Sequence, residues 1–409
     1  MKIIPCIIGL GYVGLPITLG LAKKFLTYGF DINKNRIESL KKKIDVNNEF
    51  DRKKFSKLKK IIFTNKISDI QKCNFFIICV PTPIHRNKSP NLKSLNDSII
   101  LLSKVLKKND IIFVESTVYP GVTEKCKNFL EKKTKLINNK DFFVGYSPER
   151  VNPGDKVNTL KNISKVVSIK TKNKKILKNV FKIYNLISKK IIKSSNIRAA
   201  ETAKVIENIQ RDINIAFMNE ILLICAKLKI NFKEVIRLAK TKWNFLNFEP
   251  GLVGGHCLPI DPYYLSSLAA KKNFKTRVTL AGREINDYML NYIIKELKNF
   301  LSEKNKSLRN SKIIIVGLTY KAGVTDMRNS LNFKIFKMIK KYNKKVIGCD
   351  PFVVEKTKRL FGIRDKINKN TRYDVILFLS HHKIFEKIFK NTLSSKNRNK
   401  VLDPFNYYL

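Results

Sequence analysis

The sequence is short of the residues that build disulfide scaffolds and structural zinc sites. Its 409 residues include only seven Cys. They stand at positions 6, 73, 79, 126, 225, 257 and 349, and no two of them form a C-x-x-C pair. A disulfide framework and a structural zinc site are therefore excluded. An odd number of Cys in a long chain favours a reducing compartment, so we expect a cytoplasmic protein with no metal site.

Long apolar runs are also missing beyond the N-terminus. The first 22 residues are mostly apolar and resemble a signal peptide or a membrane span. However, Gly9, Gly11 and Gly14 have the spacing of a phosphate-binding turn, which a membrane span has no reason to carry. No other stretch approaches the roughly 18 apolar residues that a span needs, so we expect no membrane association.

Acidic residues are scarce, with 32 Asp and Glu against 82 Lys and Arg, which gives a formal charge of +50. Such a charge suggests a nucleic-acid partner. However, 67 of the basic residues are Lys, spread along the whole chain, whereas nucleic-acid surfaces gather Arg and Lys on one face. The sequence thus favours a Lys-rich solvated surface that suits anionic small substrates, without nucleic acid.

Histidine is rare too, and the chain has four. His85, His381 and His382 lack ligand-like spacing with carboxylates, so we expect no special role for them. What the chain does have is a 44% hydrophobic fraction, enough for a globular protein. At about 150 residues per domain, its length indicates two or three domains.

The first part of the chain has the pattern of a parallel sheet with crossover helices. Short apolar runs alternate with amphipathic stretches, and the runs cover 3–8, 26–30, 61–63, 75–80, 111–115 and 142–146. Buried strands separated by helices are typical of doubly wound α/β domains. We therefore predict such a domain over 1–196.

A helical region follows. Apolar residues recur every three or four positions over 197–228, which predicts one long helix, and further helices are expected at 231–240, 262–272 and 278–301. The apolar face of the long helix is either a subunit interface or buried against its own chain. We assign 197–305 to this central helical region.

A second α/β unit closes the chain. The polar stretch 302–311 is the best linker, and strands are predicted at 312–316, 346–350 and 375–379 with a helix at 329–342. The predicted fold is therefore α/β, with two Rossmann-like doubly wound domains, 1–196 and 306–409, joined by a central helical region with one long helix.

The first glycine turn predicts a dinucleotide site. Gly9, Gly11 and Gly14 form G-x-G-x-x-G between a strand and a helix, so that the backbone can approach a pyrophosphate. Asp31, about 20 residues onward, stands where an acid accepts the ribose hydroxyls. A carboxylate there repels a 2′-phosphate, so NAD is favoured over NADP.

Further polar residues lie where such a fold binds ligands. Thr82 and Thr117 follow two apolar runs, at the carboxyl edge of the predicted sheet, although ordinary turns would look the same. Lys204, Asn208 and Arg211 line one side of the long helix. If these charged side chains are buried, they need an anionic ligand as a partner. If they lie on a solvated face of the helix, they need none.

The sharpest signal is the segment 248–264, in which Cys257 follows a glycine-rich loop and Asp261 stands four residues later. A thiol held beside a carboxylate suits a nucleophile that forms covalent adducts. His256 also suggests a Cys/His dyad, but adjacent side chains usually diverge.

These motifs resemble those of the UDP-glucose/GDP-mannose dehydrogenase family nearly end to end. The resemblance is carried by GLGYVG, CVPTP, ESTVYPG, GYSPERVNPGD, AAETAKVIEN, GLVGGHC and IDPYYL. Within the family, the sequence is most similar to the UDP-N-acetylhexosamine branch, in particular to its Vi polysaccharide type. This similarity is carried by the segments GYSPERVNPGD, NIQRDINIAFMNE and KWNFLNFEPGLVGGHC.

The resemblance implies an N-terminal NAD-binding domain, a dimerisation region on the long helix and a C-terminal UDP-binding domain. It also implies a four-electron oxidation of a UDP-sugar at carbon 6, using two NAD, by a homodimer. In this chemistry a thiol adds to the aldehyde intermediate, loses a second hydride and leaves a thioester for water to cleave.

Residue roles follow from the same resemblance. The implied catalytic residues are Cys257, Lys204, Asn208, Asp261, Thr117 and Glu149. The implied cofactor ligands are Gly9, Gly11, Tyr12, Val13, Gly14, Asp31, Arg36, Thr82, Thr117 and Arg328. The implied substrate ligands are Glu149, Arg150, Val151, Lys204, Asn208, Arg211, Phe248, Gly251, Gly254, Arg277 and Lys321, with Arg277 reaching the partner subunit's sugar site.

Two stretches depart from the family pattern. Leu258-Pro259 replaces the more usual Ile/Gly pair, which affects how Asp261 is presented, and 326–330 differs slightly from Asp-x-Arg-Glu-Ser. The resemblance predicts UDP-N-acetylglucosamine or UDP-N-acetylgalactosamine as substrate, for surface polysaccharide synthesis. UDP-glucose is the nearest alternative. A non-catalytic nucleotide- or nucleic-acid-binding Rossmann protein is the alternative from another class.

Overall fold

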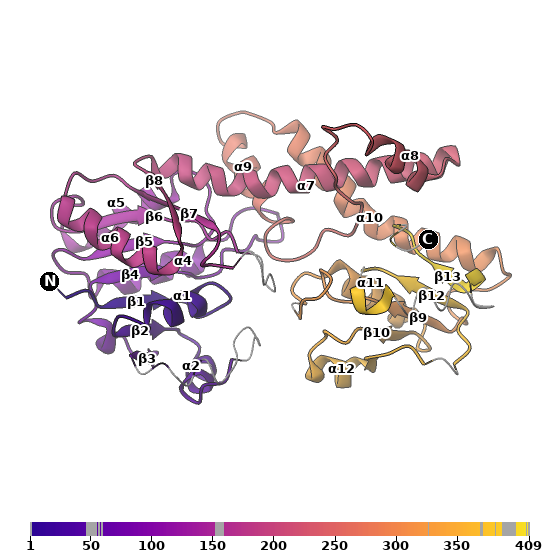
Figure 1. The fold of residues 1–409 in the computed structure, drawn as a ribbon, viewed down its shortest axis with the longest axis horizontal. Coiled ribbons are helices and arrows are strands. Elements are labelled where there is room, and N and C mark those ends of the chain that lie inside the picture. The colour runs from indigo at the N-terminus through magenta and orange to yellow at the C-terminus, as the bar shows by residue number, and fades with distance from the viewer. Residues whose placement is uncertain are drawn as a thin grey trace. The chain divides into compact units, whose positions relative to one another are not determined.

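The computed structural model describes residues 2–45, 55, 58, 60–151, 159–325, 327–368, 371–380, 382–386, 398–405 and 407. The chain forms two compact units: unit 1 comprises 1–207 and 263–273, and unit 2 comprises 208–262 and 274–409. The helix α7 (Ile197–Leu228), labelled in Figure 1, belongs to both units, since the division falls between its residues 207 and 208.

Unit 1 contains an eight-stranded sheet. Its strands are β1 (Pro5–Ile8), β2 (Thr27–Phe30), β3 (Ile61–Thr64), β4 (Phe75–Ile78), β5 (Ile111–Val114), β6 (Phe143–Tyr146), β7 (Ser164–Ile169) and β8 (Lys190–Ser194). The strand order is β3-β2-β1-β4-β5-β6-β7-β8, and every neighbouring pair is parallel except β6 and β7. The order reverses direction at β1, so the crevice of a doubly wound sheet lies beyond the carboxyl ends of β1 and β4.

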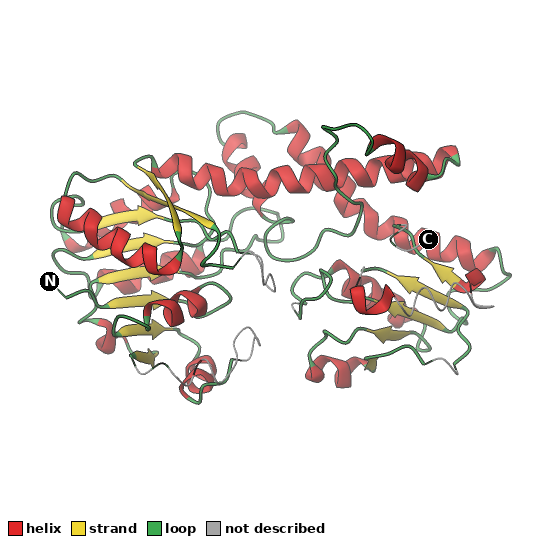
Figure 2. Cartoon of the chain, viewed as in Figure 1, coloured by secondary structure: helices red, strands yellow, loops and turns green. Residues whose placement is uncertain are grey.

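Helices cover both faces of this sheet (Figure 2). Unit 1 contains α1 (Gly14–Leu21), α2 (Lys34–Lys41), η1 (Ile67–Ile70), α4 (Lys93–Ser103), α5 (Val122–Thr134), α6 (Lys174–Ile187) and most of α9 (Asp261–Ala270). Side chains alternate between two cores: Ile7 and Ile77 face α1 and α6, whereas Cys6 and Phe76 face α4 and α5. This alternation explains why the strands are apolar throughout.

Unit 2 contains a smaller parallel sheet. Its strands are β9 (Ile313–Val316), β10 (Ile347–Cys349), β11 (Ile363–Arg364), β12 (Val375–Phe378) and β13 (Val401–Leu402), in the order β11-β10-β9-β12-β13. Its helices are α8 (Phe232–Ala239), α10 (Arg277–Ser302), α11 (Leu331–Tyr342), α12 (Glu355–Phe361) and η2 (Arg398–Lys400). Ile313 and Ile315 pack with α10 and α11, and Ile314 and Val316 pack with Phe385 on the other face.

The structure confirms the α/β class, the parallel sheets and the long helix. The helix predicted over 197–228 has those bounds, and each of the six strands predicted in the first segment is present. Strands β7 and β8 and the helix α6 between them were not predicted, because β7 begins with Ser164-Lys165 and β8 is a largely exposed edge strand. Among the described residues, no helix combines the length and the apolar content needed to traverse a bilayer.

Candidate active site

The glycine turn after β1 has no room for a side chain at Gly9 or Gly14, but it is open at Gly11. Gly9 has a φ of +90°, and a Cβ there would lie 2.9 Å from the carbonyl oxygen of Cys79. A Cβ on Gly14 would lie 1.8 Å from the carbonyl oxygen of Gly9, so α1 packs closely on the turn. A Cβ on Gly11 would meet no atom of the described residues within 4 Å, and no side chain among them caps α1. This open, uncapped helix start fits a pyrophosphate.

Asp31 follows β2 and is half-buried. Its Oδ2 accepts the N–H of Leu10 at 2.8 Å and its Oδ1 that of Asn33 at 2.9 Å, which leaves each oxygen a lone pair for a hydroxyl. Arg36, predicted as a cofactor ligand, is buried. Its Nε donates to the carbonyl of Leu10 at 3.0 Å, and its Nη1 pairs with Asp45 at 2.9 Å. Arg36 therefore braces the turn.

The loops after β4 and β5 are tied together at the carboxyl edge of the sheet. The Thr82 hydroxyl donates to the carbonyl of Thr117 at 2.7 Å, and the Ser116 hydroxyl donates to the carbonyl of Val80 at 2.7 Å. The Tyr264 hydroxyl, from α9, donates to the carbonyl of Thr82 at 2.6 Å. The structure thus brings together the two threonines that the sequence placed on separate loops.

The loop after β6 is held by its own backbone. Oε1 of Glu149 accepts the N–H groups of Arg150 and Val151, both at 2.7 Å. The Arg150 guanidinium forms a two-pronged ion pair with Glu207 of α7 and donates to the carbonyl of Ser164 at 3.2 Å. Glu207 is one helical turn from Lys204, so this loop and α7 are linked within unit 1. Residues 152–158 of the same motif lie outside the described residues.

Lys204 lies on α7 and is 8% exposed. Its ammonium forms no ion pair or side-chain hydrogen bond with any residue that the structure describes. Burying a charged group without a partner is unfavourable, so this side chain has the properties of a binding group for an anion. Arg211, two turns along α7, is exposed.

Asn208 and Asp261 are directly joined within unit 2. The Asn208 Nδ2 donates to Oδ2 of Asp261 at 2.5 Å, and both side chains are buried. Asp261 begins α9, and its N–H donates to the carbonyl of Cys257 at 2.9 Å. The thiol of Cys257 is exposed, whereas the other six cysteines are buried. One turn of backbone therefore connects an accessible thiol to a buried carboxylate and amide.

The glycine-rich loop before Cys257 is held by amide side chains. The amide of Asn219 on α7 accepts the N–H of Gly251 at 2.8 Å and donates to its carbonyl at 3.0 Å. Asn329 donates to the carbonyl of Gly255 at 3.2 Å, and a Cβ on Gly254 would lie 2.8 Å from the Asn329 carbonyl. Glycine is thus required at 254 because the 329 backbone approaches closely.

The remaining predicted ligands of unit 2, for the substrate or the cofactor, lie nearer its surface. Lys321, Arg328 and Arg277 are exposed, and Asp326 lies outside the described residues. Phe248 is half-buried and lines a cavity of about 430 Å³.

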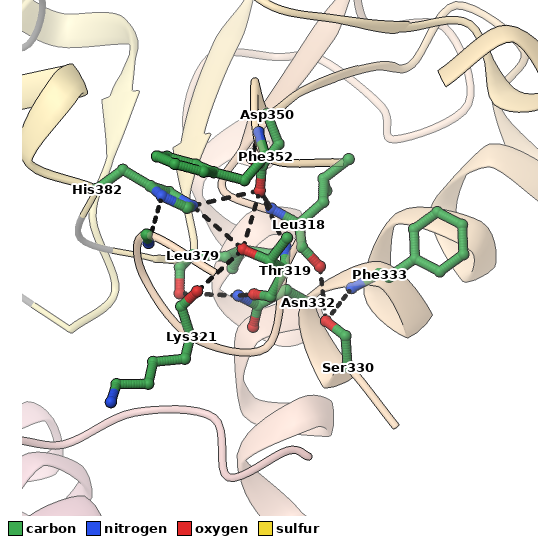
Figure 3. A network of polar contacts seen from close by, with 11 residues as sticks. Leu318, Thr319, Lys321, Ser330, Asn332, Phe333, Asp350, Phe352, Leu379 and His382 are labelled. Atoms are coloured by element: carbon green, nitrogen blue, oxygen red, sulfur yellow. Dashed lines mark hydrogen bonds and ion pairs between the residues drawn. The ribbon is translucent and has the colours of Figure 1, made fainter. Parts of the chain in front are cut away.

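The second glycine turn surrounds a buried acid that the sequence analysis did not assign. Gly317 has a φ of +83°, and Asp350, at the end of β10, accepts the N–H groups of Leu318 and Thr319 at 2.7 and 2.9 Å (Figure 3). His382, expected to have no special role, lies 3.2 Å from the same Asp350 oxygen. Burial opposes ionisation of this carboxyl, but the hydrogen bonds that it receives from His382 and from the backbone N–H groups of Thr319 and Leu318 outweigh burial and lower its pKa.

A buried charged cluster in unit 1 was also missed. The ammonium of Lys165, on β7, lies 2.6 Å from Oε2 of Glu115 and 3.5 Å from Oε2 of Glu149. Tyr184 of α6 donates to Oε1 of Glu115 at 2.9 Å. Burial raises the pKa of Glu115 to about 7, although Lys165 opposes the shift. Only the three-dimensional fold brings these groups together, since they are 16 to 69 residues apart.

The predicted site residues thus divide between the two units. Unit 1 holds Gly9, Gly11, Tyr12, Val13, Gly14, Asp31, Arg36, Thr82, Thr117, Glu149, Arg150, Val151 and Lys204. Unit 2 holds Asn208, Arg211, Phe248, Gly251, Gly254, Cys257, Asp261, Arg277, Lys321 and Arg328. Apart from Arg328, the predicted cofactor ligands are in unit 1, and the thiol of Cys257 is in unit 2.

Family models match three segments of the chain. They describe the UDP-glucose/GDP-mannose dehydrogenase family: its NAD binding domain over residues 1–188, its central domain over 198–288 and its UDP binding domain over 314–408. Together with the open glycine turn and Asp31, the first match identifies NAD as the cofactor.

Similar proteins cover nearly the whole chain. A UDP-N-acetyl-D-glucosamine 6-dehydrogenase of Salmonella typhi is 41% identical over 98% of this chain and 96% of its own length. One from Pseudomonas aeruginosa is 41% identical over 93% and 91%. A solved UDP-D-ManNAc dehydrogenase from Pyrococcus horikoshii superposes with a TM-score of 0.85, at 31% identity, covering 96% of this chain and 93% of that one. The chain therefore belongs to the UDP-glucose/GDP-mannose dehydrogenase family and is an NAD-dependent dehydrogenase.

Proposed function

We propose that this chain is a UDP-N-acetylhexosamine 6-dehydrogenase that oxidises the carbon 6 alcohol of UDP-N-acetylglucosamine or UDP-N-acetylgalactosamine to the uronate. The names of the relatives at 41% identity support the choice of sugar class. The product is an aminouronic acid unit, which we propose enters a surface polysaccharide. The cytoplasm is the proposed location, because the chain has an odd number of cysteines with no paired framework, which suits a reducing compartment.

A single observation supports the covalent route most directly. Of the seven cysteines, all within the described residues, only Cys257 exposes its side chain. It follows a loop that Asn219 and Asn329 hold in place, and its carbonyl starts the helix that carries Asp261. A positioned and accessible thiol is what an enzyme needs to trap an aldehyde.

In the first oxidation, the alcohol at carbon 6 loses its proton as it becomes an aldehyde. The ammonium of Lys204, which pairs with no side chain among the described residues, stabilises the developing alkoxide, with the Asn208 amide as a second donor. Asp261 holds that amide by its 2.5 Å hydrogen bond and takes part in proton transfer. NAD, when bound, supplies the oxidant, and conversion of an alcohol to an acid consumes two of them.

In the second half, Sγ of Cys257 bonds to the aldehyde carbon and the carbonyl oxygen takes a proton, which gives a thiohemiacetal. Its oxidation leaves a thioester on Cys257. Water then attacks the carbonyl carbon, the C–S bond breaks, and its electron pair returns to sulfur. In this proposal, Thr117 holds the water and Glu149 accepts its proton.

Ligand binding divides along the same lines. The glycine turn and Asp31 hold the dinucleotide, with Thr82 and the loop of Thr117 at the edge of the sheet. Arg150, Val151, Arg211, Phe248, Gly251 and Gly254 are assigned to the sugar nucleotide. Lys321 meets the nucleotide, Arg328 the cofactor or the diphosphate, and Arg277 the partner subunit's sugar site.

The proposal is tested by stoichiometry. Purified protein should form two NADH for each UDP-N-acetylhexosamine consumed, with no aldehyde released. Cys257→Ala should abolish uronate formation, and Cys225→Ala, a buried cysteine of the same unit, should not. One NADH per sugar, or full turnover by Cys257→Ala, would contradict the covalent route.

A panel of UDP-sugars distinguishes the proposed substrate from the alternatives. UDP-N-acetylglucosamine, UDP-N-acetylgalactosamine, UDP-N-acetylmannosamine and UDP-glucose are compared by kcat/KM. A preference for UDP-glucose would replace the proposed substrate with the nearest alternative. Binding of DNA without any dehydrogenase activity would favour the non-catalytic class.

We also propose a homodimer. Exposed apolar side chains line the cavity beside α7, with Phe217 at 53%, Leu238 at 55% and Leu246 at 60% exposure. Apolar patches of this kind are typical of subunit interfaces. Light scattering should give twice the chain mass of 47.4 kDa, and Phe217→Glu should reduce it to that of a monomer. A wild-type monomer would contradict the proposal.

A further inference from the structure

Lys165 is a fully buried lysine that the reaction scheme above does not use. Its side chain is 1% exposed, and its ammonium is surrounded by three oxygen atoms. They belong to Glu115 at 2.6 Å, the carbonyl of Pro148 at 3.2 Å and Glu149 at 3.5 Å. Burial opposes the charge, but Glu115 and Glu149 together outweigh it and raise the pKa of Lys165. The ammonium is therefore charged and is shared between two carboxylates.

Fold stability does not explain this cluster. Buried ion pairs lose hydration that their attraction barely repays, and well-packed apolar residues often serve as well or better. Here two carboxylates compete for one ammonium. Burial disfavours the ionised form of Glu115 and raises its pKa to about 7. A fold selected only for stability has no need of such an arrangement.

The location of the cluster points to the site. Glu115 directly follows β5 and Glu149 lies in the loop after β6, so both are at the carboxyl edge where ligands bind in doubly wound sheets. The side chains of Lys165 and Glu115 are 1% and 0% exposed, whereas that of Glu149 is 11% exposed. Glu149 is thus the member of the trio that reaches the protein surface.

The two oxygens of Glu149 have different surroundings. Oε1 accepts two backbone N–H groups at 2.7 Å each, from Arg150 and Val151. Among the described residues, Oε2 has only the ammonium of Lys165, at 3.5 Å. Oε2 therefore keeps the lone pair that can take a proton, and Lys165 determines where that oxygen lies.

We propose that Lys165, held by Glu115, is the positioning residue for Glu149 and that it orients Oε2 for hydrolysis of the thioester. The inference rests on the proposed function, since it assigns Glu149 to that step. In the step, water bonds to the carbonyl carbon, its proton passes to Oε2, and the C–S bond breaks with its electron pair returning to Sγ of Cys257. Lys165 itself exchanges no proton.

The consequence is specific to one step. Without Lys165, both oxidations proceed and the thioester forms, but its hydrolysis slows. General acid–base groups contribute about 10²- to 10⁴-fold to rate, and misplacement of one forfeits part of that, so we expect at least a tenfold loss in kcat. The KM values for NAD and for the UDP-sugar should change less than twofold.

The experiment combines stopped-flow NADH absorbance with intact-protein mass after acid quench, using UDP-N-acetylglucosamine or whichever UDP-sugar the panel selects. Lys165→Met should give a burst of two NADH per active site, followed by slow turnover, with a uronyl adduct on Cys257. Lys190→Met, the same change at an exposed position on neighbouring β8, should behave as wild type. A purely structural role would lower the burst and the steady rate together.

Glu115→Gln provides a second variant that retains the side-chain shape. It removes the charge that holds Lys165, so we expect the same adduct at a lower level. The inference is overturned if folded Lys165→Met and Glu115→Gln both turn over without accumulating the adduct. If wild type forms no more than one NADH per sugar, or if Cys257→Ala is fully active, the proposed function fails instead, whatever these variants do.

Discussion

The imidazole of His382 lies 3.2 Å from the carboxylate of Asp350, Nε2 to Oδ2, and both side chains are completely buried. The other ring nitrogen, Nδ1, accepts the N–H of Gly323 at 3.1 Å, so the proton of a neutral ring is on Nε2, facing the carboxylate. Phe352 stacks on the ring at 5.0 Å between centroids. His382 thus connects the end of β10 to the loop 319–323 (Figure 3).

In both glycine turns an aspartate accepts a backbone N–H group of the turn, but the two aspartates differ in how far they are buried. In unit 1, Asp31 accepts the N–H of Leu10, and in unit 2 Asp350 accepts that of Leu318. Asp31 is half-buried, so its oxygens remain open to ribose hydroxyls. Asp350 is closed off by His382, so the second turn offers no such acceptor. This difference is consistent with the matches of an NAD binding domain to the first turn and a UDP binding domain to the second.

Replacement of His382 should weaken binding of the UDP-sugar. His382→Ala leaves the N–H of Gly323 and the buried Asp350 carboxylate short of a partner, and the loss of a partner costs about 1–3 kcal/mol for a buried group such as this carboxylate. The loop that carries Lys321 then loosens. We expect the KM for the UDP-sugar to rise about tenfold, while the KM for NAD is unchanged. Calorimetry with UDP itself measures the loss directly.

The control for this variant is His85→Ala, at an exposed histidine of unit 1. It should leave both KM values unchanged. Equal increases in the KM of NAD and of the UDP-sugar in His382→Ala would show that the network supports the whole fold and not the nucleotide loop.

Charge at position 31 should determine the choice of coenzyme. Asp31→Asn keeps an oxygen for the N–H of Leu10 but removes the negative charge that repels a 2′-phosphate. The ratio of kcat/KM for NADP to that for NAD should rise at least tenfold. Asp97→Asn, an exposed aspartate on α4, is the matched control and should leave the ratio unchanged. An unchanged ratio in Asp31→Asn would mean that another group reads the ribose.

Much of the fold could be predicted because buried parallel strands are apolar throughout and helices repeat every three to four residues. The bounds of α7 follow from that period alone. Strand β8 escaped because two of its five residues are Lys and it lies at an edge. Strand β11 has only two residues, and no sequence pattern marks so short an element.

The candidate site was predictable where neighbouring residues carry the signal, as in the glycine turn and the loop of Cys257. It was not predictable where the partners come from distant segments. Lys165 is one of 67 lysines, and only the pairing of β7 with β6 brings it to Glu115 and Glu149. His382 is similar, since its partner Asp350 is 32 residues earlier and on another strand end.

The two hydrogen bonds between Asn219 and the backbone of Gly251, which form a clamp on the loop of Cys257, should contribute to both stability and rate. Asn219→Ala leaves the N–H and the carbonyl of buried Gly251 without their partners, at about 1–3 kcal/mol each. We expect the Tm to fall by about 5 °C and kcat to fall about tenfold, with the KM for NAD unchanged. Differential scanning calorimetry and steady-state kinetics check both.

Glu220→Ala changes the next residue of α7, which is exposed, and should alter neither quantity. If Asn219→Ala lowers Tm but leaves kcat intact, the loop holds its shape without the clamp, and the position of Cys257 depends on Asn329 instead.

The buried carboxyl of Glu115 should make stability fall as the pH rises. Burial raises its pKa from 4.5 to about 7 in the folded chain, while the unfolded chain retains the ordinary value. Between those values the folded state holds a proton that the unfolded state has released, so the free energy of unfolding decreases with pH by up to about 1.4 kcal/mol per unit. Below about 4.5 and above about 7 this residue has no effect on the slope.

Glu115→Gln cannot ionise, so the difference in Tm between wild type and this variant should shift in favour of the variant as pH rises from 4.5 to 7. Asp110→Asn is the matched control, since burial raises the pKa of Asp110 from 3.8 to about 6. The difference in Tm between Asp110→Asn and wild type should change between pH 3.8 and about 6 and should be constant above about 6. A Glu115→Gln difference that is constant from pH 4.5 to 7 would mean that Lys165 keeps Glu115 ionised throughout, and that the ammonium is shared between two full charges at every pH tested.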